Sequence, residues 1–142
     1  MRRGFSLPEL LVVLGIISVV ILLAVPRLGD MLDWAAVDGA ARDVTTALAV
    51  TRGAAISQST LARLEIGPDS LLIDLRIDGA WAPYRRYPGP ASHGVQLGVS
   101  NPEVTFAPNG LGWGTANSTI TLQRGDRVER VTTSRVGRVK RW

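Results

Sequence analysis

The sequence of 142 residues predicts an α+β fold, in which a long N-terminal helix packs on a small antiparallel β-sheet domain. Three observations predict this fold. Residues 10–25 carry no charge, and only Gly15 and Ser18 interrupt their apolar side chains. Small apolar residues then recur at helical spacing between residues 37 and 55. After Ser59, short apolar runs alternate with turn signals, as in antiparallel sheets.

The first part of the helix is long enough to span a membrane. A helix from Phe5 through Val25 would be about 31 Å long, close to the roughly 30 Å of a bilayer core. Arg2 and Arg3 precede it and indicate that this end is cytoplasmic. We therefore expect a transmembrane segment over residues 5–27, with the rest of the chain outside the cytoplasm.

The second part of the helix, residues 28–58, is predicted to be an amphipathic stem that packs on the sheet. Pro26 has no amide hydrogen to donate, so we expect it to kink or loosen the helix at the membrane surface. Asp38 and Arg42 form a favourable i,i+4 pair on the outer side. The apolar face of the stem consists of Val37, Ala40, Ala41, Val44, Ala47, Leu48, Ala54 and Ala55.

Residues 59–142 are predicted to form the β domain. The expected strands are Leu61–Ile66, Leu71–Ile77, Val95–Val99, Val104–Phe106, Ser118–Gln123, Arg127–Thr133 and a short last strand at Arg138–Lys140. We interpret Trp81–His93, which is rich in Pro, Gly, Tyr and Arg, as a long loop. We interpret Gly110–Gly114 as a glycine-rich hairpin turn, because its glycine spacing does not fit a dinucleotide-binding loop.

The composition offers little catalytic chemistry. The chain has no cysteine, which excludes disulfides, thiolate metal sites and cysteine nucleophiles. His93 is the only histidine, and we interpret it as a solvated loop residue without an acid–base partner. Asp30 and Asp33 are too few to form a Ca²⁺ site. We therefore expect no catalytic residues, no metal and no cofactor, and a protein that is not an enzyme.

Glu9 is unusual because it places a carboxylate at the edge of a membrane helix. A charge near the centre of such a helix costs about 2.5–3.5 kcal/mol, and less near its end. No cation within the helix can reach Glu9, so the sequence predicts a partner from elsewhere.

The N-terminal sequence resembles the class III signal of type IV pilins and type II secretion pseudopilins. The resemblance rests on Met1-Arg2-Arg3-Gly4 followed by Phe5-Ser6-Leu7-Pro8-Glu9, and it extends to Pro26. It implies that prepilin peptidase removes a leader of residues 1–4 by cutting between Gly4 and Phe5, and then methylates the amino group of Phe5. It also implies that Glu9 pairs with the N-terminus of a neighbouring subunit, which would supply the missing partner.

A second resemblance covers most of residues 40–142. Arg52-Gly53-Ala54-Ala55-Ile56, Phe106-Ala107-Pro108-Asn109-Gly110 and the closing Val131–Lys140 are similar to the GspH/FimT branch of minor pilins and pseudopilins. This branch implies a pilin-like fold and a structural subunit that initiates or tips a type II secretion pseudopilus or a type IV pilus. The expected location is the bacterial inner membrane, with a single membrane pass, and the expected partners are other pilins or pseudopilins.

The C-terminal segment is basic. Residues 124–142 contain seven Lys or Arg and two acidic residues, a balance of +5. On an extended strand Arg138 and Lys140 point to one side and Arg141 to the other. Together with Arg135, these residues could bind double-stranded DNA, which gives the alternative function of a DNA-uptake pilin. The same charges could instead protect a sheet edge or contact the acidic part of a neighbouring subunit.

Overall fold

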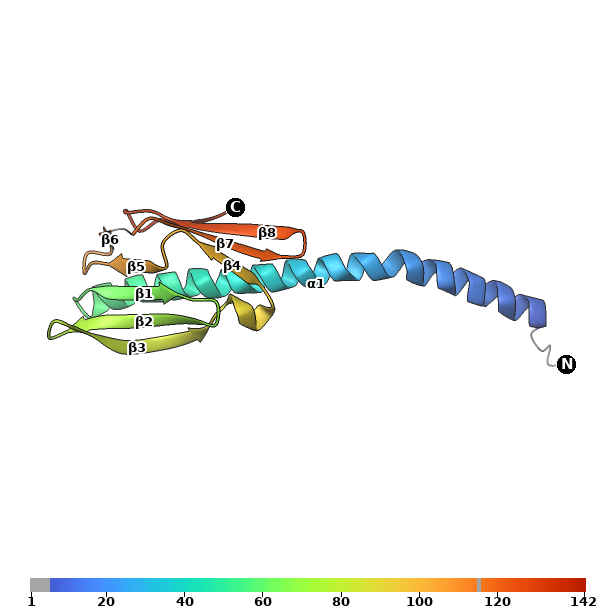
Figure 1. Ribbon diagram of the computed structural model, residues 1–142, viewed down its shortest axis with the longest axis horizontal. Helices are drawn as coiled ribbons and strands as arrows, with labels where there is room; N and C mark the ends of the chain where they lie inside the picture. The colour runs from blue at the N-terminus through green and yellow to red at the C-terminus, as the bar shows by residue number, and fades with distance from the viewer. Residues whose placement is uncertain (1–5, 115) are drawn as a thin grey trace.

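A computed structural model describes residues 6–114 and 116–142, without the side chains of residues 25–27. The helix α1, Leu7–Ser57, forms a long axis, and two antiparallel sheets pack around its C-terminal half (Figure 1). The α+β architecture expected from the sequence is confirmed. The strands form two sheets on the stem helix, where the sequence suggested one small sheet domain.

The C-terminal half of α1 supplies the centre of the core. All eight residues expected on its apolar face are buried, each no more than 4% exposed. They pack against buried side chains of both sheets, including Phe106, Leu64 and Ile120. The helical spacing of these small side chains lets the sheets approach α1 closely, because alanine adds little bulk beyond the backbone.

The first sheet has the strand order β3-β2-β1-β5-β6. Its three central strands, β2, β1 and β5, alternate buried residues with half-buried or exposed ones, as expected for a sheet with one face on a core. Their bounds are β1 Ala62–Ile66, β2 Ser70–Ile77, β3 Ala80–Pro88, β5 Glu103–Phe106 and β6 Gly112–Trp113.

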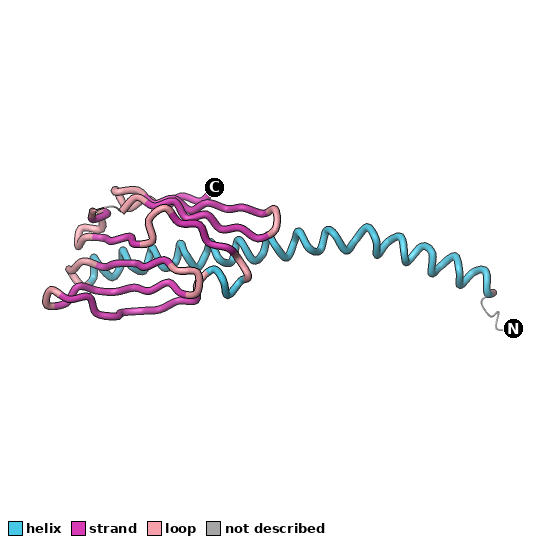
Figure 2. Tube along the Cα trace, in the orientation of Figure 1, coloured by secondary structure: helices cyan, strands magenta, loops and turns pink. Residues whose placement is uncertain are grey.

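The second sheet has the order β4-β7-β8-β9 and covers another side of the helix. In Figure 2 the magenta strands of both sheets surround the cyan helix only along the half remote from the N-terminus. Their bounds are β4 Gln96–Val99, β7 Ser118–Arg124, β8 Arg127–Thr133 and β9 Val139–Arg141.

The expectation of a long loop over Trp81–His93 was wrong. All of this segment except Gly89 lies in strand β3, Ala80–Pro88, or in the 3₁₀ helix η1, Pro90–His93. Pro83 and Pro88 suggested a loop because proline cannot donate a ladder hydrogen bond. They are tolerated because β3 is the edge strand of its sheet, where one row of amides needs no strand partner.

The other boundaries agree with expectation to within about two residues, the usual uncertainty of element ends. The glycine-rich segment forms only part of the expected hairpin turn: Gly110 lies in the turn, whereas Gly112 already belongs to β6 and pairs with Phe106 of β5. Gly110 in this turn has φ +76°, a conformation that strongly favours glycine. The strand β6 itself was not expected.

The helix α1 is a single element through positions 25–27. Figure 1 shows it curving where it leaves the sheets towards the N-terminus. Because the side chains of residues 25–27 are not described, the kink expected at Pro26 stays a prediction. The division of the helix between residues 27 and 28 likewise stays a prediction.

Candidate functional site

The N-terminal half of α1 leaves its apolar side chains uncovered. Every residue from Leu7 to Ala24 is exposed, and the sheets pack only against the later part of the helix. The helix is long and apolar enough to cross a membrane. An exposed apolar surface of this length is unstable in water, so it requires a bilayer or other helices around it.

Glu9 lies in the first turn of this exposed helix. The backbone N–H of Ser6, which precedes the helix, donates a hydrogen bond of 3.4 Å to the Glu9 carboxylate, as in a capping box. Among the described side chains, no cation pairs with Glu9. The carboxylate is therefore available to a partner from another subunit. Gly4 and Phe5, the expected processing residues, lie outside the described residues.

The register of β9 on β8 separates the last two cations of the chain. Lys140 lies opposite Thr132, and Arg141 lies opposite Val131. Because Val131 is fully buried, Arg141 is on the face that packs on α1. Lys140 is on the outer face, where its ammonium lies 3.3 Å from the ring centroid of Trp142. The two side chains point to opposite faces, as the strand alternation predicts.

Arg141 is engaged in two ion pairs within the domain. Its guanidinium lies 2.5 Å from a carboxylate oxygen of Asp38 on the stem helix and 2.5 Å from one of Glu129 on β8. The hydrogen bond from Arg141 holds the pKa of the Asp38 carboxyl below its usual value, although partial desolvation opposes it. The hydrogen bonds to Glu129 and then Asp38 raise the pKa of Arg141. Arg141 therefore fastens the C-terminal strand to the stem.

Arg135 and Arg138 lie in the turn between β8 and β9, and both are exposed. The Ser134 N–H donates a hydrogen bond of 3.0 Å to the Arg138 carbonyl and so closes the turn. Gly137 within it has φ +72°, a conformation that favours glycine. Neither arginine side chain forms an ion pair with a described carboxylate. Of the four arginines and lysines expected to bind DNA, Arg135, Arg138 and Lys140 are therefore available at the surface.

The sequence reasoning did not single out Arg130 and Trp142. The backbone groups of these two residues exchange hydrogen bonds of 3.2 and 2.9 Å, which extends the pairing of β8 and β9 by one residue. Arg130 is exposed, and Trp142 is 68% exposed. The buried Val131 and Thr133 in β8 imply that Arg130 faces outward, so strand alternation could have placed it beside Lys140.

The interpretation of His93 as a solvated loop residue was wrong. Its Nε2 lies 2.8 Å from a carboxylate oxygen of Asp43 on the stem helix. Its ring also lies over Gly39, where an added Cβ would come within 3.2 Å of Nδ1. The partner was missed because Asp43 is 50 residues away in the sequence and comes close only through the fold.

Arg124 fastens the β7–β8 turn to the stem helix. Its guanidinium pairs with Asp33 at 2.9 Å and donates a 2.7 Å hydrogen bond to the His93 carbonyl. In the same turn, Gly125 lies so close to the Asp33 side chain that an added Cβ would be 2.5 Å from an Asp33 oxygen. Asp33 thus has a structural partner, and no cluster of three metal-ligating side chains occurs within the described part of the chain.

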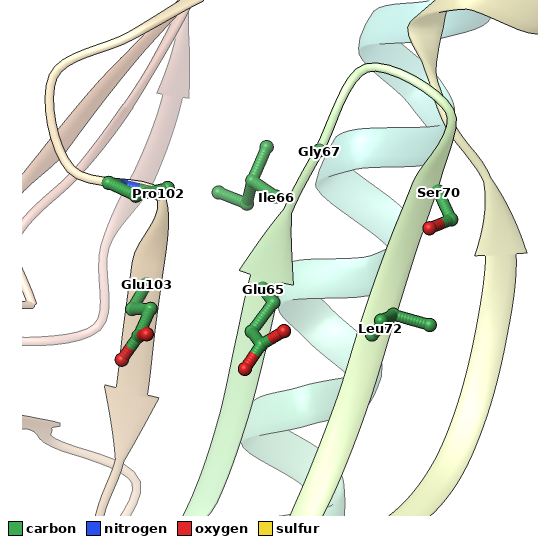
Figure 3. Close-up of a pocket in the computed structure, with 7 residues that line it drawn as sticks. All are labelled: Glu65, Ile66, Gly67, Ser70, Leu72, Pro102 and Glu103. Carbon is green, nitrogen blue, oxygen red and sulfur yellow. The ribbon is translucent and has the colours of Figure 1, made fainter.

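A small cavity of about 230 Å³ lies between β1, β2 and the start of β5. Glu65 and Glu103, on neighbouring strands, point to the same side at its edge (Figure 3). Arg63 lies 2.6 Å from Glu65, 2.9 Å from Asp74 and 3.7 Å from Glu103. Partial burial lowers the pKa of Arg63, but the hydrogen bond to Asp74 and the neighbouring charges outweigh it and raise that pKa. Arg63 thus holds the three carboxylates together by ion pairs, although its single charge balances only one of theirs.

Two protein families match the chain. Residues 40–137 match the family described as type II transport protein GspH, and residues 1–25 match the prokaryotic N-terminal methylation motif. The second match includes Gly4, Phe5 and Glu9. The methylation motif implies processing by prepilin peptidase and assembly with other pilins.

Individual relatives agree with these matches. The chain is 29% identical to the pilin-like protein PilA1 of Thermus thermophilus over 160 aligned positions, which cover 98% of this chain and 97% of that protein. The minor pilin FimU of Pseudomonas aeruginosa has a similar fold, with a TM-score of 0.62 and 20% identity over 73% of this chain and 86% of FimU. The minor pseudopilin EpsH of Vibrio cholerae has a TM-score of 0.61 and 16% identity over 75% of this chain and 95% of EpsH.

The family and the fold are those of structural pilins rather than of known enzymes. The long apolar helix fits a subunit that is anchored in a membrane before it enters a pilus or pseudopilus. The chain therefore belongs to the GspH family and is a structural subunit of the minor pilin or pseudopilin type.

Proposed function

We propose that this protein is a minor pilin or pseudopilin that enters a filament through its N-terminal helix. Prepilin peptidase removes residues 1–4 and methylates Phe5, and residues 5–27 hold the subunit in the inner membrane until assembly. The sheet domain lies outside the cytoplasm. The observation that carries this proposal is the exposed apolar half of α1, which places a carboxylate without a described cationic partner in its first turn.

Glu9 gives the assembly step its selectivity. After cleavage, the methylated amino group of Phe5 on a neighbouring subunit carries the positive charge that Glu9 lacks. A pair formed in a low-dielectric environment is stabilised only when both charges are present and close together. Subunits in the correct register satisfy both charges, whereas a subunit out of register leaves a carboxylate buried without a partner.

The first test changes Glu9 to alanine and to glutamine. Both variants should be cleaved and should remain in the membrane, because removing a charge makes insertion easier. Filaments purified from cells that express either variant should contain less of this subunit than filaments purified from cells that express the wild type. Ser18→Ala is the matched control, because Ser18 is the only other polar side chain between Leu7 and Ala24 and its hydroxyl donates to the Leu14 carbonyl at 2.8 Å. Normal incorporation of Glu9→Gln would contradict the charge pairing.

The processing step has its own measurement. Intact-mass analysis of the membrane-extracted protein should show a chain that begins at Phe5 and carries one added methyl group. A chain that retains Met1, or one that begins after Val25, would refute the proposed cleavage.

We propose that the subunit acts at the beginning or at the tip of the filament, because its family consists of minor components. Its loss should then lower the number of filaments more than their length. An antibody to the sheet domain should label filament ends. Uniform labelling along the filament would refute this position.

DNA binding is a second candidate function, supported by the outer face of the β7–β8–β9 sheet. Arg130, Lys140 and the exposed ring of Trp142 lie on this face. The outward residues of these strands, as the register places them among the described residues, include no carboxylate. Cations that lack acidic neighbours are free to contact phosphates. The partner in this second candidate function is double-stranded DNA.

A salt titration of the full chain in detergent micelles tests this function. Affinity for double-stranded DNA should fall steeply from low to physiological salt. Changing Arg138 and Lys140 together to glutamine should weaken binding and lower the salt slope by about one unit per lost contact. Arg141→Gln should leave the slope unchanged, because Asp38 and Glu129 already occupy that guanidinium. Equal binding by the double variant would exclude Arg138 and Lys140 as DNA contacts.

A further inference from the structure

A second cavity lies where the stem helix emerges from the sheets towards the membrane segment. The β7–β8 turn reaches further along α1 towards the N-terminus than the rest of the sheet domain (Figure 1). Arg124 and Gly125 hold this turn against Asp33, as described above. The attachment places the next two residues, Asp126 of the turn and Arg127 at the start of β8, beside the helix.

The cavity has a volume of about 360 Å³ and mixed charge. Asp30, Asp33 and Trp34 line it from one face of α1, and Asp126 and Arg127 line it from the turn and the start of β8. Asp33 is paired with Arg124. Among the described side chains, Asp30, Asp126 and Arg127 have no hydrogen-bond or ion-pair partner. The cavity thus offers two free carboxylates, one free guanidinium and an indole that is 52% exposed.

Its position along the helix coincides with the lipid headgroups. If the hydrocarbon core ends near residue 27, Asp30 lies about 5 Å and Trp34 about 10 Å beyond it, at about 1.5 Å per residue. The headgroup layer on each side is roughly 5–7 Å thick. Asp30 then lies within this layer, and Trp34 lies a few Å beyond it, close to the membrane–water interface where tryptophan is commonly found.

We propose that this cavity binds the headgroup of a zwitterionic phospholipid, one that combines a phosphate with an ammonium group. Arg127 binds the phosphate, Asp30 and Asp126 bind the ammonium, and the ring of Trp34 covers the cation. An anionic headgroup without an ammonium would leave both carboxylates unpaired beside its own negative charge. The proposal depends on the membrane anchoring described under the proposed function, and it adds which lipid the anchored subunit contacts.

The test follows Trp34 fluorescence in the full chain, with Trp81, Trp113 and Trp142 changed to phenylalanine. The detergent-solubilised protein is titrated with short-chain phosphatidylethanolamine and, separately, with short-chain phosphatidylglycerol, both with EDTA present. We expect saturable binding of phosphatidylethanolamine that is about fivefold tighter, the size of one partly exposed charge contact.

Two variants assign the contacts. Asp126→Asn should weaken phosphatidylethanolamine binding alone and so remove the preference, whereas Arg127→Gln should weaken the binding of both lipids. Arg130→Gln is the matched control, because it removes the same charge from the same strand but outside the cavity. Circular dichroism and thermal melts should confirm that all three variants fold like the parent.

Equal binding of the two lipids, or a preference that survives Asp126→Asn, would overturn the headgroup proposal. Flotation of the protein with vesicles tests the anchoring itself. A protein that floats but shows no lipid preference would refute only this inference. A protein that does not float would refute the membrane anchoring on which the proposed function depends.

Discussion

Changing Arg141 to glutamine should destabilise the domain without weakening its binding to DNA. Arg141 joins Glu129 of β8 and Asp38 of the stem helix through ion pairs of 2.5 Å. Its side chain is 34% exposed, whereas those of Asp38 and Glu129 are 18% and 15% exposed. The substitution therefore leaves two largely covered carboxylates without their cation.

The size of the effect follows from this exposure. Hydrogen bonds to charged groups contribute roughly 1.5–3 kcal/mol when buried, but exposed ion pairs contribute roughly 0.2–1 kcal/mol. Because solvent reaches a third of Arg141, we expect its loss to cost about 1 kcal/mol. For a domain of this size, that cost corresponds to a melting temperature lower by about 4 °C.

The assay is thermal unfolding of the full chain in detergent, followed by circular dichroism in the near ultraviolet. Arg138→Gln is the matched control, since it removes the same charge from an exposed side chain that pairs with no described carboxylate. The control should melt within about 1 °C of the wild type, because isolated surface charges contribute little. If both variants melt alike, the Arg141 ion pairs do not stabilise the fold, and the reasoning is refuted.

The pH dependence provides a second readout of the same ion pairs. Arg141 lowers the pKa of Asp38 below its ordinary value of 3.8, so the folded state favours the ionised carboxyl. This stabilisation is fully present above about pH 4 and is lost as the pH falls through the lowered pKa. Arg141→Gln removes the largest cause of that shift. The stability of the variant should therefore fall less steeply below about pH 4 than that of the wild type.

Further substitutions test the packing of the domain. Thr133→Val should lower the free energy of unfolding by roughly 1–3 kcal/mol. The buried Thr133 hydroxyl accepts a hydrogen bond of 3.0 Å from the Ser118 amide and donates one of 2.8 Å to the Ala116 carbonyl. Thr132→Val, at a half-exposed neighbouring position, is the control. Gly137→Ala should cost about 1–3 kcal/mol, because φ is +72° and the new Cβ would lie 2.7 Å from a carbonyl oxygen. Gly53→Ala should stabilise α1 by about 0.5–1 kcal/mol, since position 53 is exposed and nothing lies within 4 Å of the new Cβ. Urea unfolding of each variant measures all three effects, and a stabilising Gly137→Ala or a destabilising Gly53→Ala would contradict the geometry.

The fold was largely predictable because its strongest signals are local. A helix that must cover apolar surface repeats its small residues every three or four positions, and the face from Val37 to Ala55 follows that rule. Most strands were visible as short apolar runs between turns. The strand β3 was not, because whether Pro83 breaks a strand depends on whether that strand is at a sheet edge. Edge position is a property of the assembled sheet and has no local signature.

The side-chain pairings were predictable only where they are local. The pair of Asp38 and Arg42, four residues apart on one helix, was expected and has a distance of 2.8 Å. The pairs of His93 with Asp43 and of Arg124 with Asp33 join segments far apart in the sequence. Nothing in the sequence around His93 or Arg124 indicates these carboxylates, because both lie on the stem helix, which is distant in the sequence.

The basic C-terminal segment shows why net charge alone does not define a binding surface. Residues 124–142 carry a balance of +5, but two of their cations are already committed to the stem helix: Arg124 pairs with Asp33, and Arg141 pairs with Asp38. Strand alternation predicts that the side chains of Lys140 and Arg141 point to opposite faces of the sheet, but it does not predict which face packs on the stem helix. That choice depends on Asp38, which lies 103 residues before Arg141. A partner that carries phosphates would therefore find its contacts on the outward face, at Lys140, and a substitution at Arg141 would report on folding.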